Sequence, residues 1–407
     1  MLKKITEINL RSKTVLLRTD YNVPLKGKRI EKNSHWRIKA TLDTINYLIN
    51  QKAKIIILCH MGRPKGRIVE ELRVKPVAKF LAKILKRNLI VYKNEASFFN
   101  KDLGPIVSQF YFIPRKRGST PDKMNPGDII ILENIRFHPE EKSNSRPFAK
   151  LLSTLGDVYI GEAFAAAHRD DVSVSLLPKF LPSAAGFLLE KEINVLEDLN
   201  KKVKRPLLFI MGGAKAKTKT ELIQILLPRV DDILVGGVLA NTILAAQGIA
   251  VGKSIVEKET AKLLNDLEIT NTKIHLPVDV IASPSKDGKS LTSIRPVGNI
   301  GKENMILDIG PDTILLFRSI IEKAKTIIWN GPMGYTEVKK FKQGTDEIMK
   351  ALIKNESAFK VVGGGESISL IHKNKAFNKI GFVSTGGGAL LEFLAGKKLP
   401  GIEVLKK

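Results

Sequence analysis

The chain has 407 residues, which favours two domains over one, and 43% of its residues are hydrophobic, enough for well-packed cores. Its single cysteine, Cys59, excludes an intramolecular disulfide and a cysteine-based zinc site. The net charge of +26 would suit nucleic acid, but the cations are spread along the chain and aromatic residues make up only 6%, which argues against it. Compositional drift and a polyanionic ligand remain as explanations of the charge. No apolar run reaches the ~18 residues of a membrane span and the first residues lack the apolar core of a signal peptide, so we expect a cytoplasmic protein without a membrane partner.

The first half of the chain repeats short apolar runs that each end in polar or basic residues. The runs are continuous and not alternating, which is typical of strands covered by helices on both faces. Segments with helical periodicity, 38–49 and 76–85, lie between them. This alternation predicts a parallel sheet with right-handed crossovers. The predicted strands are 14–17, 55–58, 129–132 and 158–160.

Side chains suited to an anionic ligand follow these strands. Parallel α/β sheets bind ligands beyond the carboxyl ends of their strands, and arginine pairs bidentately with carboxylate and phosphate. Any one of these arginines could be an ordinary surface charge, but their repetition at successive strand ends predicts a basin for a small, multiply charged anion. The histidines lack partners at metal-ligand spacing, which disfavours a metal site. The predicted basin consists of Asp20, Asn22, Arg37, His60, Arg63, Arg136, His168 and Arg169.

The second half again alternates strands and helices, but its loops are rich in glycine. Segment 183–200 has helical spacing and predicts a helix that connects the halves, although a surface helix within one domain fits the same pattern. Glycine loops that open helices present unpaired N–H groups and the positive end of a helix dipole, which suits nucleotide phosphates; purely structural turns are the alternative. The predicted strands are 207–211, 233–235, 326–329, 361–362 and 382–385.

Residues 207–219, LLFIMGGAKAKTK, form the most distinctive of these segments. An apolar run that ends in Gly212 and Gly213 predicts a buried strand and a tight turn, and the lysines supply charge beside it. The spacing of a P-loop, G-x-x-x-x-G-K-[ST], is absent. A strand, a turn and the start of a basic surface helix is the alternative interpretation.

Along essentially its whole length the sequence resembles the phosphoglycerate kinase family. A colinear set of motifs is specific where a single GGG is not, and this set comprises RTDYNVPL, HMGRPKG, LENIRFHPEE, AHR, GFLLEKE, GGAKAKTK, GGVLANTILAAQGIAVGKS, LPVDV, LDIGP, WNGPMG, GGGES and STGGGALLEFLAGKKLPG. The resemblance implies reversible transfer of the acyl phosphate of 1,3-bisphosphoglycerate to MgADP, giving 3-phosphoglycerate and MgATP in glycolysis. It implies Mg²⁺ as cofactor, ADP/ATP as co-substrate and a monomer with small-molecule partners.

The same resemblance implies two doubly wound parallel-sheet (Rossmann-like) domains, joined by a helix, with a cleft between them. We expect a glycerate-binding domain over 1–180, a connecting helix over 181–200 and a nucleotide-binding domain over 201–385. Residues 386–407 are expected to return to the first domain.

Site residues carried over from the family motifs fall into four groups. The catalytic residues are Arg37, Lys215 and Lys219, and Glu366 is the metal-contacting residue. The substrate-binding residues are Asp20, Tyr21, Asn22, Arg37, His60, Met61, Gly62, Arg63, Arg136 and Arg169. The nucleotide-binding residues are Gly213, Lys215, Lys219, Gly237, Gly310, Asn330, Glu337, Gly364, Gly365, Glu366 and Ser367. If Lys215 opens a helical turn, Lys219 shares its face, whereas Lys217 points elsewhere and is a surface charge.

The chain departs from the family pattern at several positions. Glu366 stands where the family usually has aspartate, which bears on Mg²⁺ geometry, and Thr218 stands where an aspartate is common. Gly161-Glu162 replaces Asn-Asp, and Asp170-Asp171 follow Arg169 where small or neutral residues are expected. Segment 112–123 fits the family pattern poorly and is interpreted as a basic surface excursion.

The alternative function is that of a family member that has lost turnover and acts as a binding or scaffolding protein.

Overall fold

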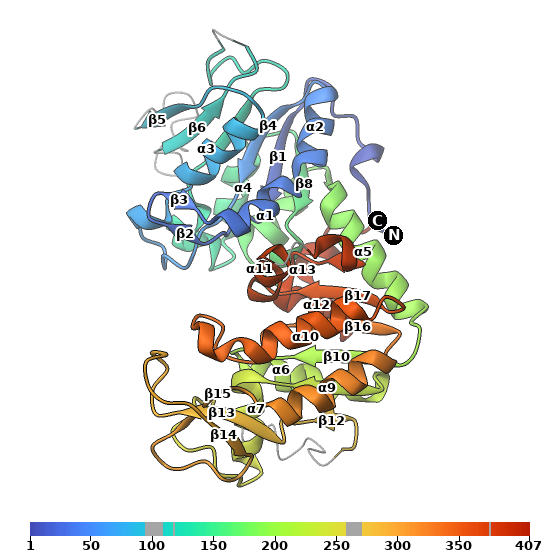
Figure 1. Ribbon diagram of the computed structural model, residues 1–407. Coiled ribbons are helices and arrows are strands. Elements are labelled where there is room, and N and C mark those ends of the chain that lie inside the picture. Colours follow the sequence, from blue (N-terminus) through green and yellow to red (C-terminus); the bar gives the residue numbers. More distant parts are fainter. Residues whose placement is uncertain (94–108, 117–118, 258–270, 374–375) are drawn as a thin grey trace. The chain divides into compact units, whose positions relative to one another are not determined.

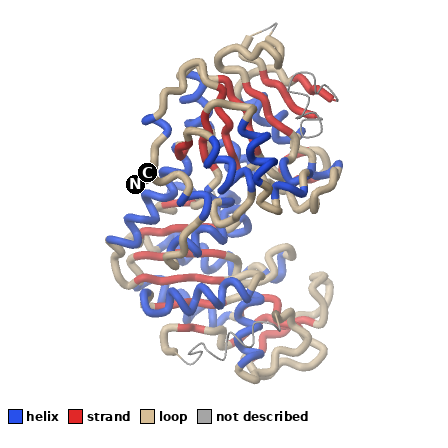
Figure 2. Tube along the Cα trace, turned by 180° about the vertical axis from the view of Figure 1, so that it is seen from behind, coloured by secondary structure: helices blue, strands red, loops and turns tan. Residues whose placement is uncertain are grey.

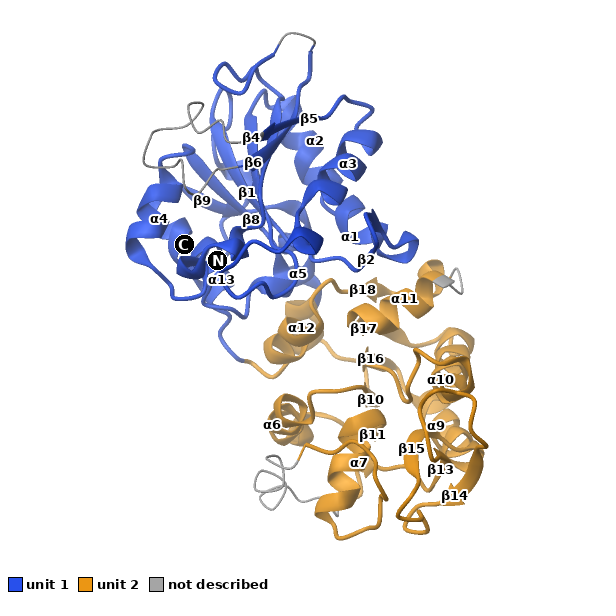
Figure 3. Ribbon diagram, turned by 90° about the vertical axis from the view of Figure 1, so that its left-hand side faces the viewer, with its two compact units in different colours: residues 1–195, 397–407 blue, residues 196–396 orange. Residues whose placement is uncertain are grey.

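The computed structural model describes residues 1–93, 109–116, 119–257, 271–373 and 376–407 (Figure 1). The chain divides into two compact units, which Figure 3 colours separately: unit 1 comprises Met1–Val195 and Lys397–Lys407, and unit 2 comprises Leu196–Gly396. Each unit contains a largely parallel sheet with helices on both faces, as the sequence predicted (Figure 2). Within the described ranges, every helix is too short or too polar to cross a bilayer.

The sheet of unit 1 has the strand order β5-β6-β7-β4-β1-β8-β9, and it is parallel from β7 to β9. The four predicted strands are present, and their apolar runs are buried as continuous stretches. A short hairpin, β2 (Leu25–Lys26) and β3 (Arg29–Ile30), lies outside this sheet. The strands of the sheet are β1 (Thr14–Thr19), β4 (Lys54–Leu58), β5 (Ile90–Lys93), β6 (Gln109–Ile113), β7 (Ile129–Leu132), β8 (Val158–Glu162) and β9 (Ser183–Ala185).

The β5–β6–β7 edge of this sheet corrects two predictions. β6 is antiparallel to both of its neighbours, so the sheet is mixed and not wholly parallel. Phe112 and Ile113, placed by the sequence in a basic surface excursion, are fully buried in β6. The apolar residues of β6 form a continuous run and do not alternate with polar residues, as expected for a strand that is buried on both faces. The basic residues of the segment begin only at Arg115.

One predicted helix of unit 1 is divided into two helices in the structure. Segment 38–49 forms two helices with a break at Ala40 and Thr41. The Thr41 hydroxyl donates to the Ile38 carbonyl oxygen at 2.9 Å and also contacts the Tyr21 hydroxyl, so its side chain competes with regular helix hydrogen bonding. The helices are α1 (His35–Lys39), α2 (Leu42–Asn50), α3 (Lys75–Ile84), α4 (Arg146–Ser153) and α13 (Pro400–Glu403).

The chain passes from unit 1 to unit 2 along α5 (Phe187–Lys201), which spans the boundary between the units. The predicted helix started earlier, but 183–185 pair with β8 as strand β9. The buried Glu162 carboxylate accepts hydrogen bonds from the Leu188 and Leu189 amides, and a Cβ on Gly186 would lie 2.2 Å from it. The helix therefore begins only after this close approach. The chain returns to unit 1 at Lys397, after helix α12 (Gly387–Leu394), whereas the sequence predicts that the returning segment begins at residue 386.

Unit 2 holds a parallel sheet of order β12-β11-β10-β16-β17-β18 and a separate antiparallel sheet of order β14-β13-β15, which the sequence did not predict. β10 has the predicted bounds, whereas β18 ends at Val383, before the turn in which Ser384 Oγ accepts from the Gly386 amide. The strands are β10 (Leu207–Met211), β11 (Asp232–Val235), β12 (Ile274–His275), β13 (Asp279–Ser283), β14 (Ser293–Pro296), β15 (Met305–Ile309), β16 (Thr326–Asn330), β17 (Phe359–Gly363) and β18 (Phe382–Val383). The helices are α6 (Ala216–Leu226), α7 (Gly237–Ala246), α9 (Pro311–Lys323), α10 (Gln343–Lys354), α11 (Gly365–Lys373) and α12 (Gly387–Leu394).

Candidate active site

A basin of charged side chains lies at one edge of the unit 1 sheet. β7, β4, β1 and β8 are neighbours and parallel, so their carboxyl ends meet at the same edge. Asp20 follows β1, His60 follows β4, Arg136 follows β7 and Arg169 comes after β8. The strand order therefore gathers residues that are far apart in the sequence.

Asp20 organises the side of the basin nearest β1. Its largely buried carboxylate pairs with the Arg37 guanidinium and accepts the Asn22 amide at 3.1 Å. Asn22 Oδ1 in turn accepts the Gly62 amide at 2.8 Å. The bond between Asn22 and Gly62 holds the loops after β1 and β4 against each other. The ion pair with Asp20 fixes Arg37 before any ligand arrives.

His60 lies between two arginines and is 1% exposed. Its Nδ1 is 3.3 Å from Arg18 Nη2, and its Nε2 is 3.3 Å from Arg169 Nη1. Burial first, and then the charges of Arg18 and Arg136, lower the pKa of His60 well below its ordinary value, so the ring is neutral at physiological pH. Because His60 is neutral, the arginines supply the positive charge of the basin.

Arg18 is a basin residue that sequence reasoning missed. It lies inside β1 and is 1% exposed, and its Nε donates to Ser173 Oγ at 2.7 Å. Ser173 Oγ donates to the buried carboxylate of Glu141 at 2.6 Å. An arginine within an otherwise apolar run was the available signal, because a buried guanidinium requires partners.

The remaining predicted residues of unit 1 differ in their burial and in their hydrogen-bond partners. Arg136 donates to the Gly62 carbonyl oxygen at 2.9 Å and to Asp171 at 3.1 Å. Tyr21 and Met61 belong to the hydrophobic core, at 0% and 1% exposure. Arg63 is exposed and His168 is half-buried.

The loop between β10 and α6 places the three lysines differently. Lys215 is exposed and immediately precedes α6 with φ 65°, in the left-handed region that costs a non-glycine residue free energy. Lys219 is 9% exposed and donates to the Gly212 carbonyl oxygen, and burial lowers its pKa to about 8 against the opposing effect of Glu366. Lys217 is exposed, and its amide donates to Glu257 at 2.9 Å.

Glycine is required where this loop meets the start of α7. Gly237 has φ +63°, and a Cβ there would lie 2.6 Å from the Gly213 backbone nitrogen. Gly213 has φ +75°. Only glycine permits such close backbone approach, and the Gly237 amide donates to the Met333 carbonyl oxygen at 2.9 Å.

Glu366, in the first turn of α11, is the candidate metal ligand. The residue is exposed, but local desolvation of its carboxyl group and then the charge of Glu337 raise its pKa, while Lys219 and Lys215 oppose the shift. A divalent cation would relieve that excess of negative charge. The described residues contain no cluster of three metal-ligating side chains. A single carboxylate suits Mg²⁺ that arrives with phosphates, because Mg²⁺ commonly uses one or two carboxylates plus substrate oxygens.

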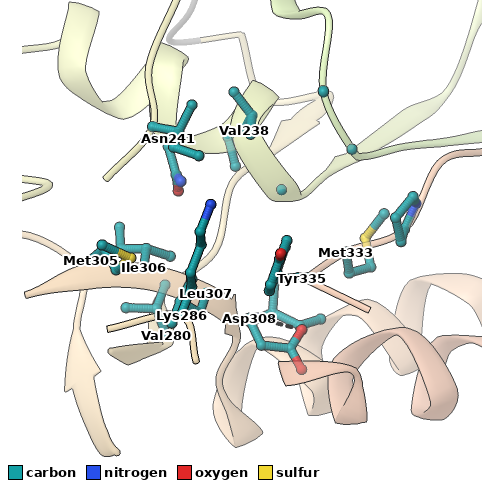
Figure 4. Close-up of a pocket in the computed structure, with 18 of the residues that line it drawn as sticks. Val238, Asn241, Val280, Lys286, Met305, Ile306, Leu307, Asp308, Met333 and Tyr335 are labelled. Atoms are coloured by element: carbon teal, nitrogen blue, oxygen red, sulfur yellow. Dashed lines mark hydrogen bonds between the residues drawn. The ribbon is translucent and has the colours of Figure 1, made fainter. Parts of the chain in front are cut away.

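A pocket with a volume of about 210 Å³ opens beside the loop between β10 and α6 (Figure 4). Its walls are mainly apolar, and Lys286 reaches toward Asn241 with its Nζ 5.8 Å from the centre of the Tyr335 ring. Four of the predicted nucleotide-binding residues line it: Gly213, Gly237, Glu337 and Glu366. The prediction missed Val238, Asn241, Val280, Lys286, Met305, Leu307, Asp308, Met333 and Tyr335. The motif LDIGP was an available signal, since Leu307, Asp308 and Ile309 all belong to the lining.

Several predicted nucleotide-binding residues lie outside the lining and have structural partners. Asn330 Nδ2 donates to the Gly387 carbonyl oxygen at 2.9 Å, and Ser367 Oγ accepts the Gly331 amide at 3.1 Å. A Cβ on Gly310 would lie 2.2 Å from the Asp279 carboxylate, which binds the start of α9. Gly364 and Gly365 form the turn that opens α11 beside Glu366.

Comparison with known proteins gives one consistent result. The family model described as phosphoglycerate kinase matches residues 5–397. A phosphoglycerate kinase of Moorella thermoacetica is 40% identical, with 98% of each chain covered. Another, of Thermomicrobium roseum, is 38% identical, with 99% of each chain covered. The solved structure of phosphoglycerate kinase from Coxiella burnetii superposes with a TM-score of 0.76 at 33% identity and covers 100% of this chain and 99% of its own.

Proposed function

The chain belongs to the phosphoglycerate kinase family and is a kinase that transfers the acyl phosphate of 1,3-bisphosphoglycerate reversibly to ADP; on that premise we propose which residues act on each substrate. The unit 1 basin binds the glycerate, and the loop and pocket of unit 2 bind the nucleotide. The observation that carries this assignment is the contrast between buried guanidinium groups in unit 1 and glycine turns beside an apolar pocket in unit 2. The match over the full length does not favour the scaffolding alternative.

In unit 1, we propose that the arginines neutralise the charge of the substrate and position it. We propose that His60 forms a hydrogen bond with the substrate. The acceptor in the direction of ATP consumption is a carboxylate with an ordinary pKa of about 4, so the reaction needs no general base at neutral pH. The neutral His60 can accept from only one of the two arginines that it contacts, and its one ring N–H is left to donate to the substrate. Arg37, already fixed by Asp20, is the arginine that we assign to the reacting group.

In unit 2, Lys215 and Lys219 are assigned to the nucleotide phosphates. Lys219 is buried beside Gly212 and Gly213, where a phosphate would replace the carbonyl oxygen as its partner. The exposed Lys215 at the start of α6 supplies a second cation on a flexible stem. Their work is electrostatic stabilisation of charge on the transferring phosphoryl group.

Mg²⁺ is proposed to bind with the nucleotide at Glu366. The cation would neutralise phosphate charge there, with the carboxylate as its protein ligand. Glu337, whose charge raises the pKa of Glu366, is assigned to the ribose at the edge of the pocket.

We also propose a monomer in the cytoplasm with small-molecule partners only. Glycolytic family membership and a single, buried cysteine support the compartment. Light scattering coupled to size-exclusion chromatography tests the monomer, and a mass near twice 45.1 kDa would contradict it.

The experiment is a coupled assay of ATP consumption with 3-phosphoglycerate at saturating Mg²⁺. We expect turnover by the natural chain and a fall in kcat of about 10²-fold or more for Arg37→Ala and for Lys215→Ala, with smaller changes in KM. Lys217→Ala is the matched control, since it removes a neighbouring exposed lysine. An unchanged kcat for either of the first two variants removes that residue from the proposed site.

A further inference from the structure

Asp171 is a buried carboxylate that bridges the basin to the protein surface. One oxygen accepts from Arg136 Nη2 at 3.1 Å, and the other accepts from Lys142 Nζ at 2.6 Å. The Asp171 side chain is 2% exposed and that of Arg136 is 7% exposed, whereas that of Lys142 is 58% exposed. The carboxylate is therefore shared between a cation inside the basin and a cation in solvent.

The partners of Arg136 leave part of its guanidinium unused. Nη2 donates to Asp171 and Nη1 donates to the Gly62 carbonyl oxygen at 2.9 Å. Its buried Nε has no hydrogen-bond partner among the residues that the structure describes. Two anchors thus orient the group while one buried N–H remains to be satisfied, which favours an incoming anion.

The charge of Asp171 acts where solvent screens little. Burial alone would raise the pKa of Asp171, but hydrogen bonds from Lys142 and Arg136 lower it below its ordinary value, so the group is ionised at neutral pH. Asp20 already pairs with Arg37, and Asp171 in the same way offsets Arg136. Arg18 and Arg169 contact His60, which is neutral. Removal of one negative charge from such a site changes the potential felt by a bound anion strongly.

We propose that Asp171 is a positioning residue that orients Arg136 and weakens the hold of the basin on anions, and that Lys142 moderates this effect from the surface. The inference rests on the proposed binding of 3-phosphoglycerate by unit 1. Asp171 and Lys142 touch no substrate in this scheme. They set how tightly the substrate or product is held.

The test measures the affinity of the full chain for 3-phosphoglycerate, and separately for inorganic sulfate, by isothermal titration calorimetry at low ionic strength. Asp171→Asn retains an oxygen acceptor and removes the charge, so we expect both ligands to bind about 3- to 10-fold more tightly. Lys142→Met leaves Asp171 less compensated, so we expect binding about 2- to 3-fold weaker. A merely structural role would weaken binding in both variants, and that outcome would overturn the proposal.

Asp170→Asn is the matched control. It removes the same formal charge one residue earlier, from a carboxylate that accepts from Asn144 at 2.8 Å and from Ser175 at 2.5 Å. We expect its affinities to stay within about twofold of the natural chain. Equal tightening by Asp170→Asn would mean that net charge alone is at work and would overturn the role of Asp171.

Arg169→Ala, which removes another basin arginine, separates this inference from the proposed function. If Arg169→Ala weakens binding of 3-phosphoglycerate but Asp171→Asn and Lys142→Met do not shift it in opposite directions, the inference fails and the basin stands. If Arg169→Ala leaves the affinity for 3-phosphoglycerate unchanged, the basin does not bind glycerate and both fail. Lys142→Met alters an exposed side chain, so it remains informative even if Asp171→Asn does not fold.

Discussion

The two units prepare for anions in different ways. Unit 1 buries the guanidinium groups of Arg18 and Arg136 and fixes them, together with Arg37, through hydrogen-bond or carboxylate partners. Unit 2 brings backbone segments together at glycines, as with Gly237 against Gly213, and adds the buried Lys219 and the exposed Lys215. A buried guanidinium cannot remain unpaired, whereas a backbone amide needs only steric access.

This contrast predicts different kinds of sensitivity. In unit 1, a substitution acts through charge and through the network behind each arginine. In unit 2, a substitution at a glycine acts through steric overlap, and one at a lysine acts through lost charge and, at Lys219, also through the lost hydrogen bond to Gly212. The following variants are ordered from the largest expected effect to the smallest.

Lys219→Ala tests whether charge in the unit 2 loop is as important as charge in the basin. We expect kcat to fall about 10²- to 10³-fold, because the buried ammonium group beside Gly212 is lost from the phosphate site. Lys217→Ala is the control, and we expect its kcat to be nearly unchanged. Steady-state assays of the two variants at saturating ATP measure the effect. An equal fall in kcat for both variants would contradict the distinction between the two lysines.

Gly237→Ala tests the steric side of the comparison. The new Cβ would meet the Gly213 nitrogen at 2.6 Å, in a backbone conformation with φ +63°. We expect a loss of about 2–3 kcal/mol in the free energy of unfolding and weaker ADP binding. Urea denaturation and calorimetry with ADP measure the two effects. Gly248→Ala is the control, since it has φ +77° but no atom within 4 Å of its Cβ, and it should cost less.

Glu141→Gln tests the network behind Arg18. Burial raises the pKa of Glu141 to about 7, so the folded state holds a proton that the unfolded state releases near its ordinary pKa of 4.5. This contribution to stability is present below pH 4.5 and is lost as the pH rises to about 7. We expect Glu141→Gln to flatten the fall in the free energy of unfolding between pH 5 and 7 by about 1–3 kcal/mol. Denaturation at several pH values measures it, and an unchanged slope would contradict the assignment.

Glu366→Asp should produce the smallest effect. The shorter carboxylate remains at the start of α11 beside Lys219, so charge is kept and only its reach changes. We expect the concentration of Mg²⁺ needed for half-maximal nucleotide binding to change by about 2- to 5-fold. Calorimetric titration of ADP at graded Mg²⁺ measures this, with Glu366→Gln as the variant that loses the charge. If Glu366→Gln behaves as Glu366→Asp does, Glu366 is not the ligand.

The strands and the strand-end residues were readable from the sequence because both are local. A continuous apolar run of five residues such as 207–211, followed by two glycines, favours an interior strand buried on both faces, and β10 has those bounds. Parallel pairing then places Asp20, His60, Arg136 and Arg169 at one edge without further information. The four predicted residues that line the nucleotide pocket came from the family motifs that the sequence resembles and not from local periodicity.

Other features depended on contacts between distant segments. The direction of Tyr21 into the core is set by Thr41, the neutrality of His60 by surrounding arginines, and the ionisation of Asp171 by Lys142 and Arg136. Much of the pocket wall comes from the antiparallel β13 and β15, whose pairing no local pattern marked. Local periodicity determines which segments are strands and where charged loops begin. The burial of a side chain and the charges around it are sums over neighbours from the whole fold, so only the tertiary structure decides them.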